Sequence, residues 1–286
     1  MTWKSLSPAS FMCNPILRDG PDPPKKGTMP LWCSLITRQV SLKSPEAISP
    51  AGQKALKKEL DGLRSRKTWD EDNPMELNAL LKDPKYPEAM IGRVFGIMGV
   101  RSDEVKKSLE DLDMKFRVVF QGSNVRTKTG TSAIDLYDEV SNAPASFTAS
   151  RVVLGCAAVS HMRVSFRDAL QAFLQAKIST PGRVSTWIEL PREWLPASWF
   201  YDGEARTKPK YHRPVCELLL ALYGHPESGP LYDNLMEKVL VSDNWERVYE
   251  WPGVFIHPDG SVLVIYVDDL MMAGIAGVDT KHWESL

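Results

Sequence analysis

The sequence has few of the residues that build covalent or metal-held frameworks. Among its 286 residues there are four cysteines and five histidines. The cysteines never form a C-x-x-C pair, and the histidines lie singly along the chain. These counts exclude a disulfide scaffold and a zinc finger, and they indicate reduced thiols in a cytosolic or nuclear compartment.

Long hydrophobic runs and a strong net charge are also missing. The apolar runs are far shorter than the roughly 18 residues that a spanning helix requires, and the N-terminal segment RDGPDPPKKG is polar. We therefore expect no signal peptide, no transmembrane segment and no membrane partner. The formal net charge is -1, so an electrostatic binding site must be a local patch.

The composition is that of a globular protein, with 43% hydrophobic and 25% charged residues. It is sufficient for one large or two smaller folded units. Residues 1–50 mix Pro, Ser and Gly without a sustained period, which predicts a poorly ordered arm. Beyond residue 50, helical and alternating patterns are interspersed, which predicts a mixed α+β fold.

Two helices and several strands have clear signals. Leu56, Leu60 and Leu63 predict an amphipathic helix that starts near residue 50. Apolar runs predict extended elements over residues 90–100 and 114–120. A second helix is predicted over residues 146–162, capped by Ser146 or Thr148. Its predicted buried face consists of Val152, Val153, Cys156, Ala157 and Val159.

Two adjacent acids interrupt the apolar stretch SVLVIYVDDLMMAG at residues 261–274. Residues 262–267 predict a strand buried on both faces, and residues 270–273 a second strand, with Asp268 and Asp269 at the turn. Like charges about 4 Å apart repel by roughly 4 kcal/mol at an effective dielectric of about 20. Either the turn is solvated, or a divalent cation such as magnesium offsets the repulsion.

A third carboxylate follows another predicted strand. The alternation of Met162, Val164 and Phe166 predicts a half-buried strand, and a helix is predicted to start at Ala169. Asp168 therefore lies at the carboxyl end of a strand, where ligands bind in sheets that are covered by helices. Three carboxylates are what a two-metal phosphoryl-transfer site needs.

Basic residues gather in two stretches without acids. In MKFRVVFQGSNVRTKTG, Lys115 and Arg117 share one face of a predicted strand, and Arg126 and Lys128 follow in a loop. This ribbon is suited to phosphate, although charges also protect edge strands from aggregation. The segment RTKPKYHRP is either a loop over a polyanion or a solvated run. Its basic residues are Arg206, Lys208, Lys210 and Arg213.

The segment Tyr266-Val267-Asp268-Asp269 resembles the YVDD motif of reverse transcriptases. Five further segments resemble, in the same order, blocks of the copia-type retrotransposon polymerase. They are KALKKELDGLRSRKTWD, MKFRVVFQG, AIDLYDEVSNAPASFTASRVVLGCAA, RDALQAFLQAKI and CELLLALYGHPESGPLYDNL. The similarity covers roughly residues 50–274. On this resemblance the chain is identified as a member of that family.

The resemblance implies the fingers and palm of a right-hand polymerase, with an antiparallel palm sheet packed on helices. Fingers would span residues 51–146 and 179–220, and palm residues 147–178 and 221–286. The implied reaction is RNA-directed DNA synthesis by two-metal nucleotidyl transfer to a primer 3′-hydroxyl. The implied partners are an RNA or DNA template with primer, deoxynucleoside triphosphates and other Pol segments. Because the family's thumb and RNase H domain would follow the YVDD hairpin, we expect this chain alone to polymerise poorly.

The resemblance also assigns roles to single residues. Asp168 and Asp268 would hold Mg²⁺ (or Mn²⁺), with Asp269 assisting. Lys115 and Arg117 would clamp the triphosphate. Phe173 would clash with a 2′-hydroxyl and so select deoxynucleotides, although it could equally be a core aromatic. Gln121 and Gly122 would also contact the nucleotide. Nucleic acid would be bound by Arg126, Lys128, Arg206, Lys208, Lys210, Arg213, Tyr223 and Gly224.

Two positions depart from the family pattern. Glu227 replaces a glutamine close to where nucleotide and template would lie, and Leu170 replaces a lysine beside the first aspartate. An alternative function is therefore that of an inactive retroelement remnant that at most binds nucleic acid. A second alternative is a metal-dependent phosphohydrolase that shares only the carboxylates.

Overall fold

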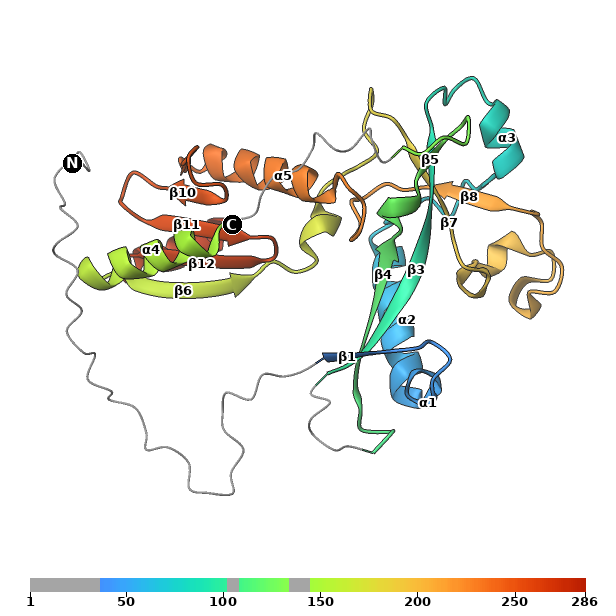
Figure 1. Ribbon diagram of the computed structural model, residues 1–286, viewed down its shortest axis with the longest axis horizontal. Helices are drawn as coiled ribbons and strands as arrows, with labels where there is room; N and C mark the ends of the chain where they lie inside the picture. Colours follow the sequence, from blue (N-terminus) through green and yellow to red (C-terminus); the bar gives the residue numbers. More distant parts are fainter. Residues whose placement is uncertain (1–36, 102–107, 134–144) are drawn as a thin grey trace.

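The computed structural model describes residues 37–101, 108–133 and 145–286. This part of the chain forms two lobes, each built around its own β-sheet (Figure 1). One lobe contains a seven-stranded sheet and the other a five-stranded sheet. We refer to them as the seven-stranded lobe and the five-stranded lobe. With helices packed on both sheets, the fold is mixed α+β, as the sequence predicts.

The long strand β3 organises the seven-stranded sheet. It pairs in antiparallel fashion with β1, β4 and β5 and in parallel with β7, and β8 and β2 continue the sheet beyond β7. The strands are β1 (Thr37–Val40), β2 (Met75–Glu76), β3 (Met90–Arg101), β4 (Asp113–Phe120), β5 (Arg126–Thr127), β7 (Thr186–Glu189) and β8 (Pro214–Glu217). The extended elements predicted around residues 90–100 and 114–120 are confirmed as β3 and β4.

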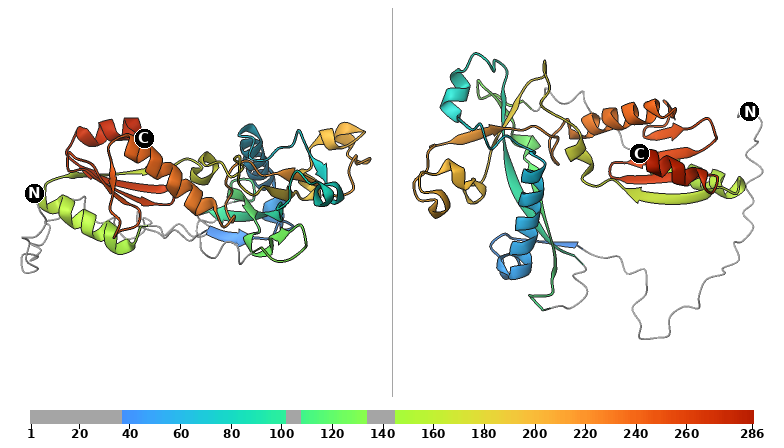
Figure 2. Two further views of the ribbon diagram at one scale, coloured as in Figure 1. Left: turned by 90° about the horizontal axis from the view of Figure 1, so that it is seen from above. Right: turned by 180° about the vertical axis from the view of Figure 1, so that it is seen from behind.

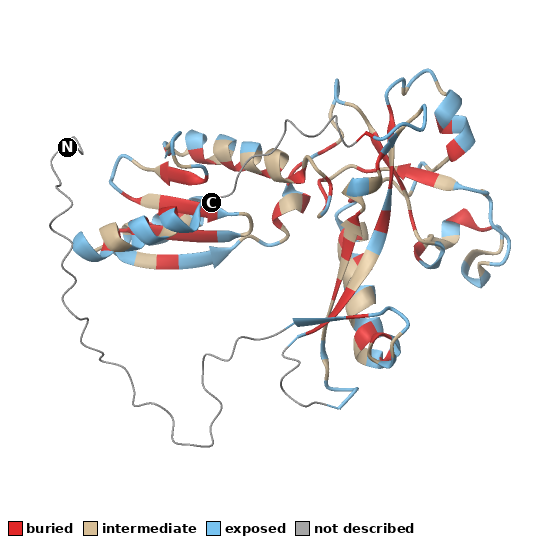
Figure 3. Ribbon diagram, in the orientation of Figure 1, coloured by how far each residue is buried: buried red, intermediate tan, exposed pale blue. Residues whose placement is uncertain are grey.

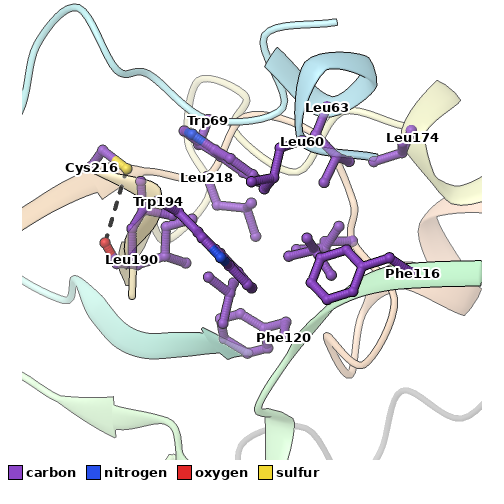
Figure 4. Close-up of a cluster of buried hydrophobic side chains, with 14 of the residues drawn as sticks. Leu60, Leu63, Trp69, Phe116, Phe120, Leu174, Leu190, Trp194, Cys216 and Leu218 are labelled. Carbon is purple, nitrogen blue, oxygen red and sulfur yellow. Dashed lines mark hydrogen bonds between the residues drawn. The ribbon is translucent and has the colours of Figure 1, made fainter. Parts of the chain in front are cut away.

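Helix α2 (Pro50–Ser65) lies along β4 and covers the core of this lobe. Its first turn is capped by Ser49, whose hydroxyl accepts a hydrogen bond from the Gly52 N–H at 3.2 Å. Leu60 and Leu63 point inward and join a cluster that includes Trp69, Phe116 and Phe120 (Figure 4). The predicted amphipathic helix is therefore confirmed. Two short helices complete the first part of the chain, α1 (Pro45–Ile48) and α3 (Leu77–Lys82).

The expected N-terminal arm is wrong for residues 37–50. There, β1 pairs with β3, with Thr37 opposite Arg101, and α1 follows with Ser44 as its cap. Each of these elements is only four residues long, which is too short to show a period in the sequence. The remaining residues of the expected arm, 1–36, lie outside the described part of the chain.

The five-stranded sheet is antiparallel throughout, in the order β6-β12-β11-β10-β9. Its strands are β6 (Arg163–Asp168), β9 (Glu246–Arg247), β10 (Val254–Ile256), β11 (Val262–Tyr266) and β12 (Asp269–Gly274). The two strands predicted on either side of the paired aspartates are confirmed as β11 and β12.

Helices cover both faces of this sheet (Figure 2). Helix α4 (Phe147–Val159) packs on the face that carries Val264 and Met271. Helices α5 (Ser228–Ser242) and α6 (Val278–Ser285) pack on the face that carries Leu263 and Met272. Because side chains alternate along a strand, burial of both faces accounts for the continuous apolar runs of β11 and β12. The buried residues concentrate inside each lobe (Figure 3).

Helix α4 begins where predicted, because the Ser146 hydroxyl accepts a hydrogen bond from the Ala149 N–H at 3.0 Å. Its buried face agrees with the prediction at Val153 and Ala157 and differs at the other three positions. Ala149, Val153 and Ala157 face the sheet, whereas Val152 and Val159 are 44% and 71% exposed and Cys156 is half-buried. The helix is apolar on most of its circumference, so the pattern could not single out the face on which small alanines allow close packing.

The helix predicted to start at Ala169 is replaced by a single 3₁₀ turn, η4 (Ala172–Gln175). Gln171 has a left-handed backbone, with φ of 54°, and this ends the regular path from β6. The turn joins the two lobes, since Ala172 lies in the core of the five-stranded lobe and Leu174 in the core of the other. None of the helices in the described ranges is both long and apolar enough to cross a membrane.

Candidate functional site

The three aspartates singled out in the sequence meet at one end of the five-stranded sheet. Asp168 is the last residue of β6 and Asp269 the first residue of β12, and the two lie directly opposite each other. Val267 and Asp268 form the two-residue turn between β11 and β12, and Val267 has φ of 58°. The Asp268 carbonyl oxygen accepts a hydrogen bond from the Ala169 N–H at 2.7 Å. The main chain therefore holds all three acids in one place.

The carboxylate oxygens of these three aspartates do not all lie within 4.8 Å of one another. Asp168 and Asp269 are exposed and Asp268 is half-buried. Among the described residues, one group of acids, histidines or cysteines has three ligand atoms within 4.8 Å of one another, and it does not include these aspartates. Mutual repulsion favours such a separation. Carboxylate oxygens are the ligands that a hard divalent cation such as Mg²⁺ prefers.

Tyr232, on α5, lies close to the aspartates. It is 3% exposed, and its hydroxyl has no hydrogen-bond partner among the residues described. Burial raises the pKa of Tyr232 to about 12, and the charges of Asp268 and Asp168 contribute to this rise. The hydroxyl therefore stays protonated. Sequence reasoning missed it, because Tyr232, Met236 and Leu240 at helical spacing are typical of an ordinary core face.

A row of aromatic rings runs from Tyr232 to the seven-stranded lobe. The Phe173 ring centroid lies 6.1 Å from that of Tyr232 and 4.8 Å from that of Tyr223. The Arg117 guanidinium lies 4.8 Å from the Tyr223 centroid, within the range of a cation–π contact. Phe173 is half-buried and packs at the border of the five-stranded core, as the core-aromatic alternative requires.

Lys115 and Arg117 lie on one face of β4, and both are half-buried. Burial lowers the pKa of Lys115, with the charge of Arg117 acting in the same direction, while Asp268 opposes the change. The charge of Asp268 in the five-stranded lobe thus acts on Lys115 in the seven-stranded lobe. Since β4 pairs with β3 alone among the described strands, the edge-strand alternative also remains open.

Glu59, on α2, adjoins the two basic residues. Its carboxylate accepts a hydrogen bond from the Val118 N–H at 3.4 Å. Burial raises the pKa of Glu59, and the charges of Arg117 and Lys115 oppose the rise. The positive charge of this face of β4 is therefore partly compensated from within its own lobe.

The predicted nucleotide and nucleic-acid contacts at Gln121, Gly122, Tyr223 and Gly224 come together at a close crossing of two chain segments. The Phe120 N–H donates to the Tyr223 carbonyl oxygen at 2.7 Å. A Cβ atom on Gly122 would lie 2.4 Å from the Gly224 carbonyl oxygen, so that neither segment could carry a side chain there. Glycine is thus required for the close approach, and the crossing lies beside the Arg117–Tyr223 contact.

Three of the other predicted nucleic-acid contacts share one cleft. Arg126, Lys128 and Arg213, together with Arg93, line a cleft of about 320 Å³. Within it Lys128 donates to the Asp83 carbonyl oxygen at 2.8 Å, and Arg213 is paired with Glu189. A larger cleft of about 620 Å³ also includes the Lys128 side chain in its lining.

The remaining basic residues lie elsewhere. Arg206, Lys208 and Lys210 belong to a segment at the end of the seven-stranded lobe that is remote from the five-stranded sheet (Figures 1 and 2). Arg206 lies 3.7 Å from a carboxylate oxygen of Glu204, and Lys210 donates to the Ser198 carbonyl oxygen at 2.8 Å. The structure does not bring these three residues to the aspartates.

The two departures from the family pattern have different surroundings. Glu227 forms an ion pair with Arg183, which compensates the charge that the glutamate introduces. Leu170 is exposed beside β6, and its side chain carries no positive charge at the position where the family has a lysine.

The group with metal-ligand spacing consists of His257, Asp259 and His282. The histidines lie singly along the chain, which excludes a zinc finger but not a group assembled by the fold. The signal that could have indicated this group is the H-x-D spacing of the first two residues, but its third member comes from a distant helix.

A scan against protein-family models finds no match to the chain, and a search of curated proteins also finds none. The functional assignment accordingly depends on the residues themselves and on their arrangement.

Proposed function

We propose that the chain is the fingers-and-palm part of a copia-type RNA-directed DNA polymerase. The observation that carries this proposal is the pairing of Asp168 with Asp269, beside Asp268, at the end of an antiparallel sheet. In this assignment the five-stranded lobe is the palm and the seven-stranded lobe the fingers. The expected ranges agree with it, since β4 and β7 fall in the fingers and β6 and β11 in the palm.

Asp168 and Asp268 would hold Mg²⁺ or Mn²⁺, with Asp269 assisting. Bound there, the metal would activate the primer 3′-hydroxyl and neutralise the incoming triphosphate. Asp168 and Asp269 come from two neighbouring strands and Asp268 from the turn between β11 and β12, so the sheet fixes the positions of their main chains. The buried, protonated Tyr232 hydroxyl would orient a carboxylate oxygen of this site.

Lys115 and Arg117 would bind the triphosphate from the fingers. Charge-assisted hydrogen bonds to phosphate are stronger than neutral ones, and they stabilise the negative charge that spreads in the transition state. Phe173 would lie under the deoxyribose, held in place by its ring contacts with Tyr223 and Tyr232. The close crossing at Gly122 and Gly224 would allow the main chain to approach the nucleotide.

Binding of a deoxynucleoside triphosphate in the presence of Mn²⁺ tests the proposal directly, because it does not require a complete polymerase. Asp168→Asn and Asp268→Asn are each expected to weaken metal-dependent binding at least tenfold. Lys115→Ala should weaken it by about ten- to a hundredfold, as a charged hydrogen bond contributes roughly 1.5–3 kcal/mol. Asp61→Asn is the matched control, since Asp61 is an exposed acid on α2. Unchanged binding in both aspartate variants would contradict the proposal.

The cleft formed by Arg93, Arg126, Lys128 and Arg213 favours one other candidate function. A remnant without catalytic activity would bind nucleic acid through such basic residues. Its affinity would fall linearly with salt on a double-logarithmic plot, with a slope that reports the number of phosphates contacted. Salt-dependent binding without any metal-dependent nucleotide binding would favour this candidate over the polymerase.

A further inference from the structure

A second cluster of ligand-type side chains lies at the other end of β11. His257 follows β10, Asp259 lies in the turn before β11, and His282 comes from α6. The Asp259 Oδ2 atom is 3.0 Å from His257 Nδ1 and 2.8 Å from His282 Nε2. The two imidazole centroids are 4.4 Å apart. Three donor atoms thus converge from two elements.

The main chain fixes the position of the carboxylate. Gly260 has φ of 90°, and its N–H donates to the His257 carbonyl oxygen at 2.9 Å, which closes the turn. The Ser261 N–H donates to Asp259 Oδ1 at 2.8 Å. One carboxylate oxygen is therefore held by the main chain, and the other is left to face the two rings.

Helix α6 is held over the sheet by contacts of its own. The Trp283 indole N–H donates to the Ser165 hydroxyl at 2.8 Å, and the same hydroxyl donates to the buried Asp279 at 3.3 Å. These bonds set the rotation of the helix and with it the direction of His282. Outer contacts of this kind orient the ligands of metal sites.

Proton bookkeeping favours a cation between these groups. The Asp259 N–H donates to His257 Nδ1 at 3.3 Å, which requires a lone pair on that nitrogen. The same nitrogen lies 3.0 Å from the Asp259 carboxylate oxygen, which also carries lone pairs. In the imidazole form with a lone pair on Nδ1 the two acceptors repel, and a shared metal cation removes this repulsion, as a proton on Nδ1 also would. The indole N–H of Trp245, whose ring packs on both imidazoles, has no partner among the described residues.

The donor atoms determine the class of cation. Two imidazole nitrogens and one carboxylate oxygen suit zinc and its neighbours, whereas magnesium and calcium prefer oxygen alone. A tetrahedral ion with bonds of about 2.0–2.2 Å separates its ligand atoms by roughly 3.3–3.6 Å. The two measured separations need to open by only about half an ångström to reach this geometry. Asp259 is partly exposed, so water can reach the fourth position.

We propose that His257, Asp259 and His282 bind one divalent transition-metal ion of the zinc class. The ion fastens α6 to the turn between β10 and β11 and so stabilises the outer end of the five-stranded lobe. It is separate from the aspartate cluster, since the five residues of β11 between the two sites span roughly 16 Å at about 3.3 Å per residue. The histidine-containing cluster binds zinc, whereas the three aspartates are the proposed magnesium ligands.

Titration of the chelator-treated full chain with Co²⁺ and then Zn²⁺ tests this site. One equivalent of Co²⁺ should give the visible absorption of a tetrahedral complex, and Zn²⁺ should displace it. Zn²⁺ should also raise the melting temperature, whereas Mg²⁺ should not. His257→Gln, Asp259→Asn and His282→Gln are each expected to weaken Zn²⁺ binding at least tenfold. His161→Asn, at an exposed histidine on the same lobe, is the control.

Histidine modification of the unmutated protein keeps the proposal testable if a variant fails to fold. Zn²⁺ should protect His257 and His282 from diethylpyrocarbonate, as mapped by mass spectrometry, and leave His161 and His212 reactive. The proposal is overturned if Co²⁺ gives no tetrahedral spectrum. It is overturned equally if Zn²⁺ binding survives the histidine substitutions unchanged, or if Zn²⁺ leaves both cluster histidines reactive.

Discussion

His225 should make the stability of the seven-stranded lobe depend on pH. The side chain is 4% exposed, and its ring lies 4.7 Å from the ring of Phe120, centroid to centroid. Its Nδ1 accepts a hydrogen bond from the Glu227 N–H at 3.2 Å, so the neutral ring carries its proton on Nε2. Burial, together with the charge of Arg183, lowers the pKa of His225 to about 3.

The size of the effect follows from proton linkage. In the unfolded chain the imidazole pKa is about 6.5, so as the pH falls the unfolded state takes up the proton first. Stability that is fully present above pH 6.5 is then lost at about 1.4 kcal/mol per pH unit, until the folded pKa is reached. Between pH 6.5 and pH 5 the free energy of unfolding should fall by about 2 kcal/mol from this residue alone.

Urea unfolding of the wild type and of His225→Asn at several pH values between 7 and 5 measures this loss. Asparagine does not titrate, and its side-chain oxygen can accept the Glu227 N–H. The variant should be less stable at pH 7, because it lacks the ring contact with Phe120, but its stability should fall by about 2 kcal/mol less on acidification. His161→Asn should follow the wild type. Parallel curves for His225→Asn and the wild type would show that His225 does not cause the pH dependence.

Four other substitutions test the packing. Gly224→Ala should destabilise the protein by at least about 2 kcal/mol, because φ is 87° and the new Cβ would lie 2.2 Å from the Phe120 carbonyl oxygen. Gly130→Ala, with φ of 83° and open space around it, should cost only about 1 kcal/mol in the same urea titration. Phe255→Ala should cost about 3–5 kcal/mol, since the side chain is fully buried. Tyr232→Phe should leave the melting temperature unchanged or raise it, because it removes a buried hydroxyl without a partner.

The parts of the fold that could be predicted from sequence are those whose signal is local. The β-branched run before Asp268 predicts a buried strand, and the leucine spacing of α2 predicts an amphipathic helix. Both elements are present in the structure. The capping of α4 by Ser146 is equally local. Only Val153 and Ala157 of its predicted buried face are buried, however, because the sequence of a helix that is apolar all round does not indicate which side packs on a sheet.

The misses share a different cause, because they depend on contacts between distant segments. The pairing of β1 with β3 orders four residues that have no pattern of their own. His282 meets Asp259 only because α6 is fastened through Ser165, which belongs to a third element. Tyr232 becomes a neighbour of the aspartates through the packing of α5, and its spacing alone predicts a core residue.

The pairing of β6 with β12 has a consequence for how the aspartate site could fail. A shift of β6 by one residue would place Arg167, in place of Asp168, opposite Asp269 and would turn every β6 side chain to the other face. An ion pair would then replace two facing acids, and the proposed divalent-cation site would be lost although no acidic residue had been changed. The buried contacts of β6, such as those of Ser165, therefore maintain the strand register on which the proposed aspartate site depends. A substitution at such a buried β6 position could abolish the proposed activity by shifting the register between β6 and β12, without touching the aspartates.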